Sequence, residues 1–403
     1  MRNKGLSRLA LPLVFAAVMA FLLMGIAGAE TTGTTPGGYT YSIMDGVATI
    51  TGYTGTGTAL IIPSMIDDSV PVRIIGFEAF KGKSSLLSIE IPFGVTSIGD
   101  SAFWTCRGLT SVSIPDSVNH IGDKAFVGCS ALESVSIPSS ITSIGEGTFD
   151  SCEGLTSINI PSSITNIGAE AFLYCTGLTS INIPDSVTSI GNGAFAACSG
   201  LTSVSIPSSV TGIENSTFFG CTGLTSVTIP SSISIIGHYS FQYCNRLTSV
   251  NIPDSVTYIG IQAFEGCIGL TSMNIPNSVV NIDGLAFNEC SNLTSIIIPS
   301  SVINIGMDAF AGSPVTIHGY PGSYAEIYAN DNAIPFVPLD GNPAEKPGDA
   351  NGDESIDIMD LVTIIDYIVS DTKPGSMVNA DANGDGVVDI MDLVWIIDVI
   401  VGG

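Results

Sequence analysis

The sequence predicts an α+β protein: a long solenoid of stacked coils built on a parallel β-sheet, followed by a small all-α module. Three observations carry this prediction. All nine cysteines recur every 23 residues, at positions 106 to 290. Ten prolines and eleven phenylalanines keep the same step, at positions 92 to 299 and 80 to 310. After residue 347 the repeat ends, and two aspartate-rich segments follow, each continuing into an apolar stretch.

Residues 1–29 have the organisation of an export signal peptide. Basic residues lie within the first eight positions, before an apolar run over residues 9–26 and a small-residue cleavage site at residues 27–29. The apolar run is long enough that an uncleaved membrane anchor remains an alternative. After cleavage the chain would be secreted, and no later segment of the sequence is long and apolar enough to span a bilayer.

Each coil of the predicted solenoid follows the unit LTSVSIPDSVNHIGDKAFVGCSA, residues 109–131. Leu109, Val112 and Ile114 alternate at strand spacing, which predicts one short strand per coil with its apolar side chains facing inward. Pro115 ends that strand because proline has no N–H to donate. Gly122 allows a turn where the chain returns along the other side of the core.

A repeat of about 20 to 29 residues is the signature of a leucine-rich-repeat solenoid, in which each coil buries its apolar edge by stacking on its neighbours. We therefore assign residues 30–337 to a solenoid with a cap at each end. The outward strand positions are polar and nearly uncharged, with serine in one column throughout. Serine ladders that bond to each other and to water are the structural interpretation, and ligand binding is the alternative.

Aromatic residues in the variable columns are candidates for a surface that stacks on a sugar or anchors a protein: Trp104, Tyr174, Phe219 and Tyr243. Packing against adjacent coils is the alternative. The cysteine column also allows two interpretations. An exported protein meets an oxidising compartment, and stacked coils place neighbouring cysteines within bridging distance. The odd number and the parallel side chains favour a column of buried free thiols.

The pattern IPxSVTxIGxxAFxxC, over about residues 38–335, resembles the BspA-like, or Treponema-type, leucine-rich repeats. TYSIMDGVATITGY resembles the hairpin that opens such domains, and VTIHGYPGSYAEIYANDNAIPF resembles their closing cap. The resemblance implies a surface or secreted protein, often an adhesin, that binds a protein or glycan ligand. It does not name that ligand.

Residues 338–347 form a predicted linker, and residues 348–403 contain two copies of one segment, starting at Asp349 and Asp381. In each copy, oxygen-bearing side chains stand at positions 1, 3, 5, 9 and 12, the spacing with which a 12-residue loop surrounds Ca²⁺. Two calcium ions are therefore expected. The predicted ligands, with Ser355 and Val387 contributing backbone carbonyls, are Asp349, Asn351, Asp353, Ser355, Asp357 and Asp360, and Asp381, Asn383, Asp385, Val387, Asp389 and Asp392.

The first loop carries Glu354 at position 6, where the second loop keeps Gly386. A sharp turn prefers glycine at this position, so strain of about 1 kcal/mol at Glu354 would weaken the first site.

The two predicted helices carry two apolar stripes each. We expect one stripe to bury itself in the other helix: Leu361, Ile364, Ile365 and Ile368 against Leu393, Ile396, Ile397 and Ile400. A second stripe remains, which includes Ile358, Val362 and Ile365 and their counterparts 32 residues later. So small a module cannot cover both stripes, and an exposed apolar face marks a partner site. A poorly packed calcium module is the alternative.

The tail, residues 348–401, resembles a type I dockerin, the module that attaches a secreted subunit to a cohesin domain on a scaffoldin, as in cellulosomes. An Ile-Met pair stands where many members carry Ser-Thr. The resemblance implies calcium-dependent cohesin binding through positions that are identical in the two copies, so that two docking orientations are feasible. The implied contact residues are Ile358, Met359, Val362, Ile365 and Asp366, and Ile390, Met391, Val394, Ile397 and Asp398.

The net charge of −26 disfavours nucleic acid as a partner, because nucleic-acid binding needs clustered Lys and Arg. An enzyme is also disfavoured. The sequence contains only three histidines, and its solenoid carboxylates do not recur as a facing pair. We therefore expect no catalytic residues and a secreted recognition subunit, held at the cell surface through a scaffoldin. The alternatives are a dockerin-bearing enzyme acting on polysaccharide or peptide, and a free surface adhesin.

Overall fold

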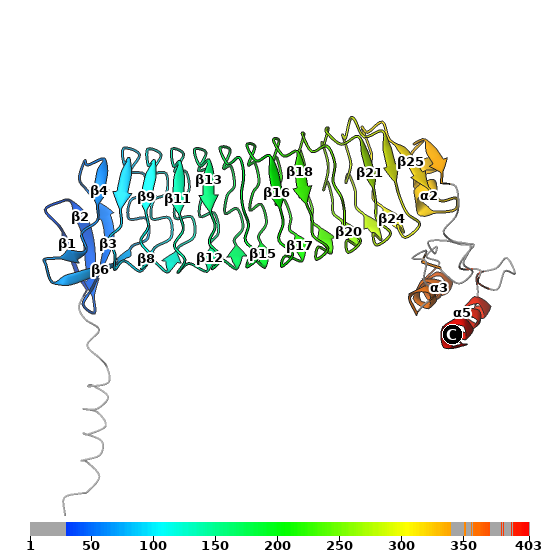
Figure 1. Ribbon diagram of the computed structural model, residues 1–403, viewed down its shortest axis with the longest axis horizontal. Coiled ribbons are helices and arrows are strands. Elements are labelled where there is room, and N and C mark those ends of the chain that lie inside the picture. The colour runs from blue at the N-terminus through cyan, green and yellow to red at the C-terminus, as the bar shows by residue number, and fades with distance from the viewer. Residues whose placement is uncertain are drawn as a thin grey trace, which may run out of the picture.

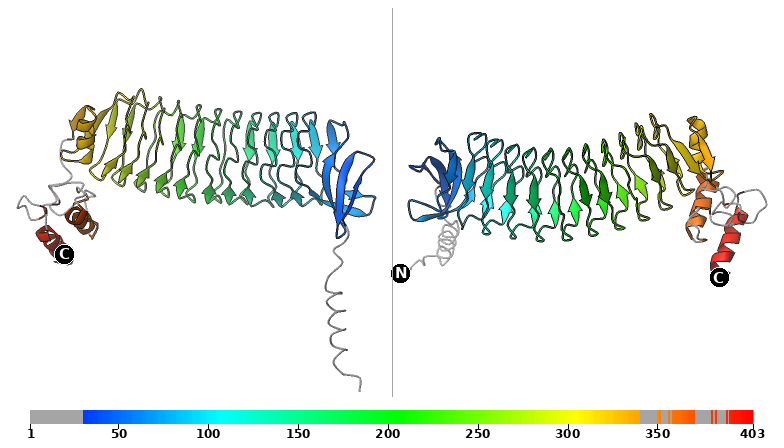
Figure 2. Two further views of the ribbon diagram at one scale, coloured as in Figure 1. Left: turned by 180° about the vertical axis from the view of Figure 1, so that it is seen from behind. Right: turned by 45° about the horizontal axis from the view of Figure 1, so that its top comes forward.

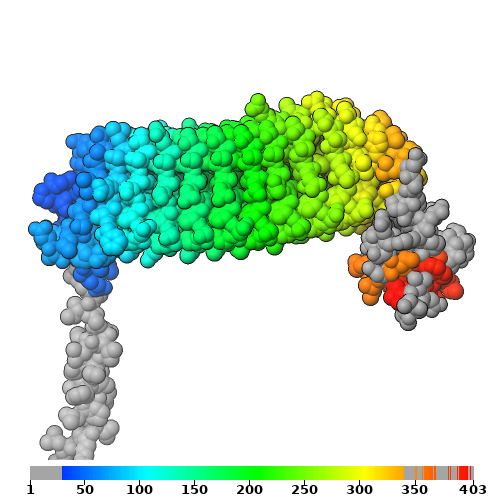
Figure 3. Space-filling model, in the orientation of Figure 1, coloured from blue at the N-terminus to red at the C-terminus, as the bar shows by residue number. Residues whose placement is uncertain are grey.

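The computed structural model describes residues 30–339, 350–351, 356, 358–370, 380, 382, 388 and 390–402. The predicted leader and most of the predicted linker lie outside these residues. Residues 30–339 form one elongated solenoid (Figure 1), and Figure 3 shows its coils packed closely one after another. Among the described helices, none has the length and apolar character needed to cross a bilayer.

The strand predicted in each coil lies on one long side of the solenoid. In β11, for example, Val135 points inward and is buried, while the serines on either side are exposed. Neighbouring strands pair in parallel with a shift of one repeat, so Ser134 lies beside Ser111 and Ser157. The strands of this side are β4 (Ala59–Ile61), β7 (Ser88–Glu90), β9 (Ser111–Ser113), β11 (Ser134–Ser136), β13 (Ser157–Asn159), β16 (Ser203–Ser205), β18 (Ser226–Thr228), β21 (Ser272–Asn274) and β23 (Ser295–Ile297).

A second set of parallel strands lies on the opposite side, which the prediction of one strand per coil missed (Figure 2). The returning segment is extended, so the backbone of His120–Ile121 pairs with Ser97–Ile98 of the preceding coil. Except for β6, these strands have two residues each: β6 (Val70–Ile75), β8 (Ser97–Ile98), β10 (His120–Ile121), β12 (Ser143–Ile144), β14 (Asn166–Ile167), β15 (Ser189–Ile190), β17 (Gly212–Ile213), β19 (Ile235–Ile236), β20 (Tyr258–Ile259), β22 (Asn281–Ile282) and β24 (Asn304–Ile305).

Both predicted caps are present. At the N-terminal end, β1 (Thr31–Thr34), β2 (Tyr39–Met44) and β3 (Val47–Tyr53) form an antiparallel group that joins β6, and β5 (Met65–Ile66) pairs with β6. At the other end, β25 (Thr316–Gly319), α2 (Tyr324–Asp331) and β26 (Phe336–Pro338) close the solenoid. Tyr328 of α2 packs edge-on against Phe310, with ring centroids 5.9 Å apart.

A ladder of phenylalanine rings fills the core. From Phe80 to Phe310 the rings of adjacent coils lie nearly parallel, with centroids 5.1 to 5.7 Å apart. Each ring is buried, so a coil covers its phenylalanine only when both neighbours are in place. This mutual burial holds the solenoid together, because an isolated coil has no core of its own.

The nine cysteines are free and fully buried, as the interpretation as unpaired thiols predicts. Each thiol donates to the carbonyl oxygen of the phenylalanine 26 residues earlier, over 3.0 to 3.3 Å. Ser313 occupies the same position in the last coil and makes the same bond to Phe287, at 2.7 Å. The column therefore needs a small buried donor, and burial raises the pKa of Cys198 to about 12.

Hydroxyl groups connect the coils at the turns and beside the strands. Ser186 Oγ donates to the carbonyl oxygen of Ile164 over 2.7 Å, and Thr188 Oγ1 donates to that of Thr165 over 3.2 Å. The same bonds recur along the solenoid, as at Ser163. The repeated Ser and Thr residues therefore contribute bonds between coils, in columns other than the strand-face serines from which we predicted a ladder.

Gly122 is required for a different reason from the predicted turn. A Cβ atom at this position would lie 2.4 Å from the backbone nitrogen of Asp100 in the preceding coil. In the same coil the left-handed backbone conformations occur at Lys124 (φ 59°) and Gly128 (φ 70°). Close stacking of the coils, rather than a positive φ, thus explains the glycine column.

Candidate functional site

Two helices follow the solenoid, α3 (Ile358–Ser370) and α5 (Ile390–Gly402). Both consist mainly of apolar residues, and each has an aspartate in its first turn, where a negative charge interacts favourably with the helix dipole. The helices start at the Ile-Met pair of each predicted loop. The twelfth loop position therefore lies in the first helical turn, as Asp360 and Asp392 show.

A small core joins the two helices and is centred on Ile364 and Ile396, both fully buried. Leu361 and Leu393 pack against it, together with Trp395. The predicted buried stripe was therefore correct for these positions and wrong for four others, which are exposed: Ile365, Ile368, Ile397 and Ile400. Successive helix residues are about 100° apart, so burying Ile364 turns Ile365 away from the centre of the contact.

The described part of the calcium loops contains two fully buried carboxylates, Asp360 and Asp392. The backbone N–H of Asn351 donates to Asp360 Oδ1 over 3.0 Å, which ties position 3 of the first loop to position 12. A buried carboxylate needs hydrogen bonds or a cation to replace its lost hydration. An all-oxygen donor set closed in this way fits a hard cation such as Ca²⁺.

Only Asn351, Asp360 and Asp392 of the predicted ligands can be placed. The other predicted ligands lie outside the described residues: Asp349, Asp353, Ser355 and Asp357, and Asp381, Asn383, Asp385, Val387 and Asp389.

An apolar face, the docking face, is repeated on the two helices. We define it by Ile358, Met359, Val362 and Ile365 on α3, and Ile390, Met391, Val394 and Ile397 on α5. Equivalent residues are almost equally exposed: Ile358 and Ile390 at 67% and 66%, and Met359 and Met391 at 54% and 55%. The side chains of Asp366 and Asp398, also predicted contacts, lie outside the description. Two equivalent apolar surfaces are thus accessible at the predicted positions.

The aromatic candidates on the solenoid are mostly separate. Trp104 is half-buried, with the Lys81 ammonium group 5.1 Å from its ring, and Tyr174 is exposed. Only Phe219 and Tyr243 meet, edge to face at 5.9 Å. These residues therefore do not form one continuous stacking surface.

A second aromatic group on the solenoid consists of His238, Tyr239 and Tyr258, which sequence reasoning missed. Their signal was available in the sequence. They replace polar residues that stand in the same columns of earlier coils. The three histidines do not meet, since His120 lies in β10, His238 follows β19 and His318 lies in β25.

Comparisons with known proteins agree with both parts of the chain. Residues 73–202 and 189–316 match the BspA type leucine rich repeat region, in six copies. Residues 347–400 match the type I dockerin domain. No curated protein matches the chain.

Among solved structures, a leucine-rich repeat protein from Bacteroides ovatus is 25% identical over 78% of this chain and 100% of its own, with a TM-score of 0.47. A leucine rich cell surface protein from Faecalibacterium prausnitzii is 30% identical over 75% of this chain and 98% of its own, with a TM-score of 0.48. The Treponema pallidum leucine rich repeat protein is 29% identical over 60% and 87%, with a TM-score of 0.38.

Proposed function

This chain belongs to the BspA-type leucine rich repeat family and carries a type I dockerin domain, and from that premise we propose a secreted, non-catalytic recognition subunit of an extracellular assembly. The solenoid binds a protein or glycan ligand, and the dockerin attaches the subunit to a cohesin domain on a scaffoldin.

The observation that supports attachment is the docking face. Eight apolar side chains are exposed on two short helices whose shared core is small. Water contact with so much apolar surface is unfavourable, by roughly 25 cal/mol for each Å². A partner that covers the docking face would remove that cost.

Calcium would prepare the docking face. Bound Ca²⁺ supplies positive charge that offsets the mutual repulsion of the loop carboxylates. Asp360 and Asp392 lie in the first turns of α3 and α5, one residue after Met359 and Met391. Ligation through these two aspartates would therefore fix the start of each helix, and with it the exposed Ile-Met pairs.

The test is binding of the full chain to a panel of recombinant cohesin domains, with Ca²⁺ and with EDTA. We expect at least one cohesin to bind with Ca²⁺ and to be released by EDTA. Because the two faces are equivalent, Ile358→Asp with Met359→Asp should leave binding largely intact, as should the equivalent pair in α5. All four substitutions together should abolish it.

Tyr174→Ser, on the solenoid, is the control and should bind as the native chain does. Cohesin binding that persists in EDTA, or that survives all four substitutions, would contradict the proposal. Calcium binding without capture of any cohesin would favour the free adhesin instead.

A further inference from the structure

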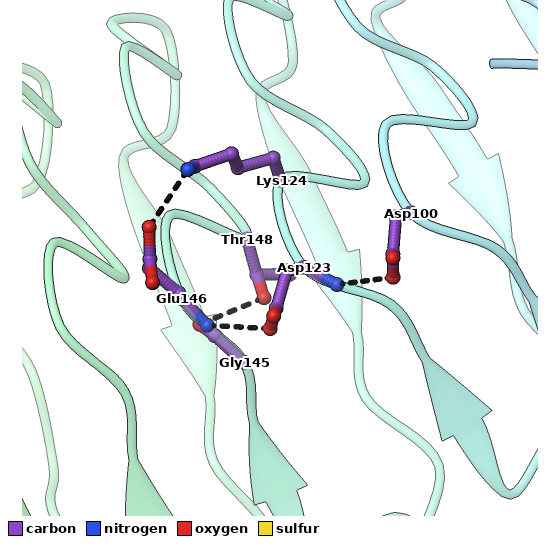
Figure 4. A network of polar contacts seen from close by, with 6 residues as sticks. All are labelled: Asp100, Asp123, Lys124, Gly145, Glu146 and Thr148. Atoms are coloured by element: carbon purple, nitrogen blue, oxygen red, sulfur yellow. Dashed lines mark hydrogen bonds and ion pairs between the residues drawn. The ribbon is translucent and has the colours of Figure 1, made fainter. Parts of the chain in front are cut away.

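The strand side formed by β17, β19, β20, β22 and β24 changes character along the solenoid. In the N-terminal coils, the turn after each of these short strands is polar. Asp123 N–H donates to Asp100 Oδ1 over 3.0 Å, and Glu146 N–H donates to Asp123 Oδ1 over 2.9 Å (Figure 4). Lys124 forms an ion pair with Glu146 at 2.7 Å. These coils present charged groups that bond to one another.

Apolar and aromatic side chains replace them in two later coils. We call this group the aromatic corner and define it as Ile235, His238, Tyr239, Tyr258 and Ile261. Ile235 and Tyr258 are neighbours in the strand register. The His238 ring lies 6.4 Å from the Tyr239 ring and 6.1 Å from the Tyr258 ring. Ile235, Tyr239 and Ile261 are 37 to 47% exposed, so the corner is a continuous and accessible surface.

Hydrogen bonds hold the corner in place. His238 N–H donates to Asn215 Oδ1 over 2.9 Å, and His238 Nδ1 accepts from Ile261 N–H over 2.9 Å. The Tyr258 hydroxyl donates to Asp283 Oδ2. A partner would therefore meet side chains that are already ordered, which reduces the entropy lost on binding.

The surroundings of the corner are acidic. Glu214 in the preceding coil and Asp283 in the following coil stand in the column that is glycine in most other coils. From residue 125 to residue 339 the sequence has fourteen acidic residues and one basic residue, Arg246. Arg246 belongs to the turn before the other strand side. No basic group of these coils therefore competes for the carboxylates beside the corner.

This combination selects the partner. Aliphatic side chains at Ile235 and Ile261 are best covered by other apolar side chains, and a tyrosine face attracts a cation. A second copy of this chain also has a charge of −26, so repulsion disfavours self-association. We propose that the aromatic corner binds a basic, apolar polypeptide segment, with Lys or Arg near Tyr239 and the carboxylates of Glu214 and Asp283. The inference rests on the proposed role of the solenoid as a recognition surface.

The test selects displayed random twelve-residue peptides on the full chain in Ca²⁺. Selected peptides should be enriched in Lys, Arg and aliphatic residues, and should bind at least tenfold more weakly at 500 mM than at 50 mM NaCl. The informative variant combines Ile235→Ser, Tyr239→Ser and Ile261→Asn. Other coils carry Ser189, Ser216 and Asn192 in these columns, so the variant introduces residues that the fold already accepts.

The triple variant should bind the selected peptides at least tenfold more weakly, whereas Tyr174→Ser should not change binding. Peptides without net positive charge, unchanged affinity of the triple variant, or no enrichment at all would overturn the proposal. Glycan-array binding that the triple variant loses would also overturn it, in favour of a sugar site. Cohesin binding should stay intact in the triple variant, which separates failure here from failure of the attachment proposal.

Discussion

At the residue scale, the cysteine column shows how a repeat uses one chemical group many times. The thiols are buried among the phenylalanine rings, and burial raises the pKa of Cys106, Cys198 and Cys290 to about 12. The reactive thiolate is therefore not populated near neutral pH. The thiols survive as hydrogen-bond donors in a compartment where accessible cysteines oxidise.

The raised thiol pKa values predict alkaline instability. Unfolded thiols titrate near pH 8.5, so the stabilisation is fully present below that pH and is lost as pH rises toward about 12. Each thiol then contributes a slope of about 1.4 kcal/mol per pH unit to the fall in unfolding free energy. Cys198→Ser should reduce the total slope by that amount, because Ser313 shows that a hydroxyl makes the same bond without titrating.

Urea unfolding between pH 8 and 11 measures this slope. A variant with an unchanged slope would show that the buried thiols do not cause the alkaline loss.

Sequence reasoning at this scale predicted which residues are buried, and it predicted less well why they are there. The buried free thiols were predicted from their odd number and parallel arrangement. The reason for Gly122 was not, because contact between a Cβ atom and the next coil depends on the spacing of coils, which no single repeat contains.

At the element scale, length decides what a sequence pattern can predict. Strands such as β9 have three residues flanked by apolar neighbours, and their alternation is visible in the sequence. Strands such as β10 have only two residues and show no periodicity, so they form because stacking brings extended segments together. For α3 and α5 the sequence predicted the helices and the exposed positions, but not which neighbouring isoleucine would face inward.

The two neighbouring isoleucines of α3 provide a matched test. Ile364→Ala removes a fully buried side chain from the core of the dockerin and should reduce its unfolding free energy by about 2 to 5 kcal/mol. Ile365→Ala removes an exposed side chain and should change stability by less than about 0.5 kcal/mol. Thermal unfolding in Ca²⁺, followed by the fluorescence of Trp395, measures both.

Equal losses of stability at the two positions would show that the helices pack through a wider contact than the core around Ile364.

At the scale of the whole molecule, the caps determine whether the solenoid remains a single body. Parallel strands have unpaired backbone groups at both ends of a sheet, and such edges pair with other chains. Here β1 to β3 cover one end, while α2 and the proline-containing strand β26 cover the other. The opening hairpin and closing segment were both identified in the sequence, since each departs from the 23-residue pattern.

Removal of the N-terminal hairpin should therefore cause association. Deleting residues 30–53 exposes the edge of β6 and one face of the buried Phe80 ring. We expect the full chain to be monomeric and the truncated chain to form larger species, measured by size-exclusion chromatography with light scattering. The expected order would be refuted if the truncated chain stayed monomeric and folded, or if the full chain associated equally.

The constant step between coils has a consequence for inheritance. Coils stack about 4.8 Å apart, so an in-frame gain or loss of 69 nucleotides, the coding length of 23 residues, would move the aromatic corner by that increment relative to the closing cap. Neither the residues of the corner nor those of the docking face would change. Mutation can thereby tune reach separately from affinity, and related subunits could present similar grips at different heights above a common support.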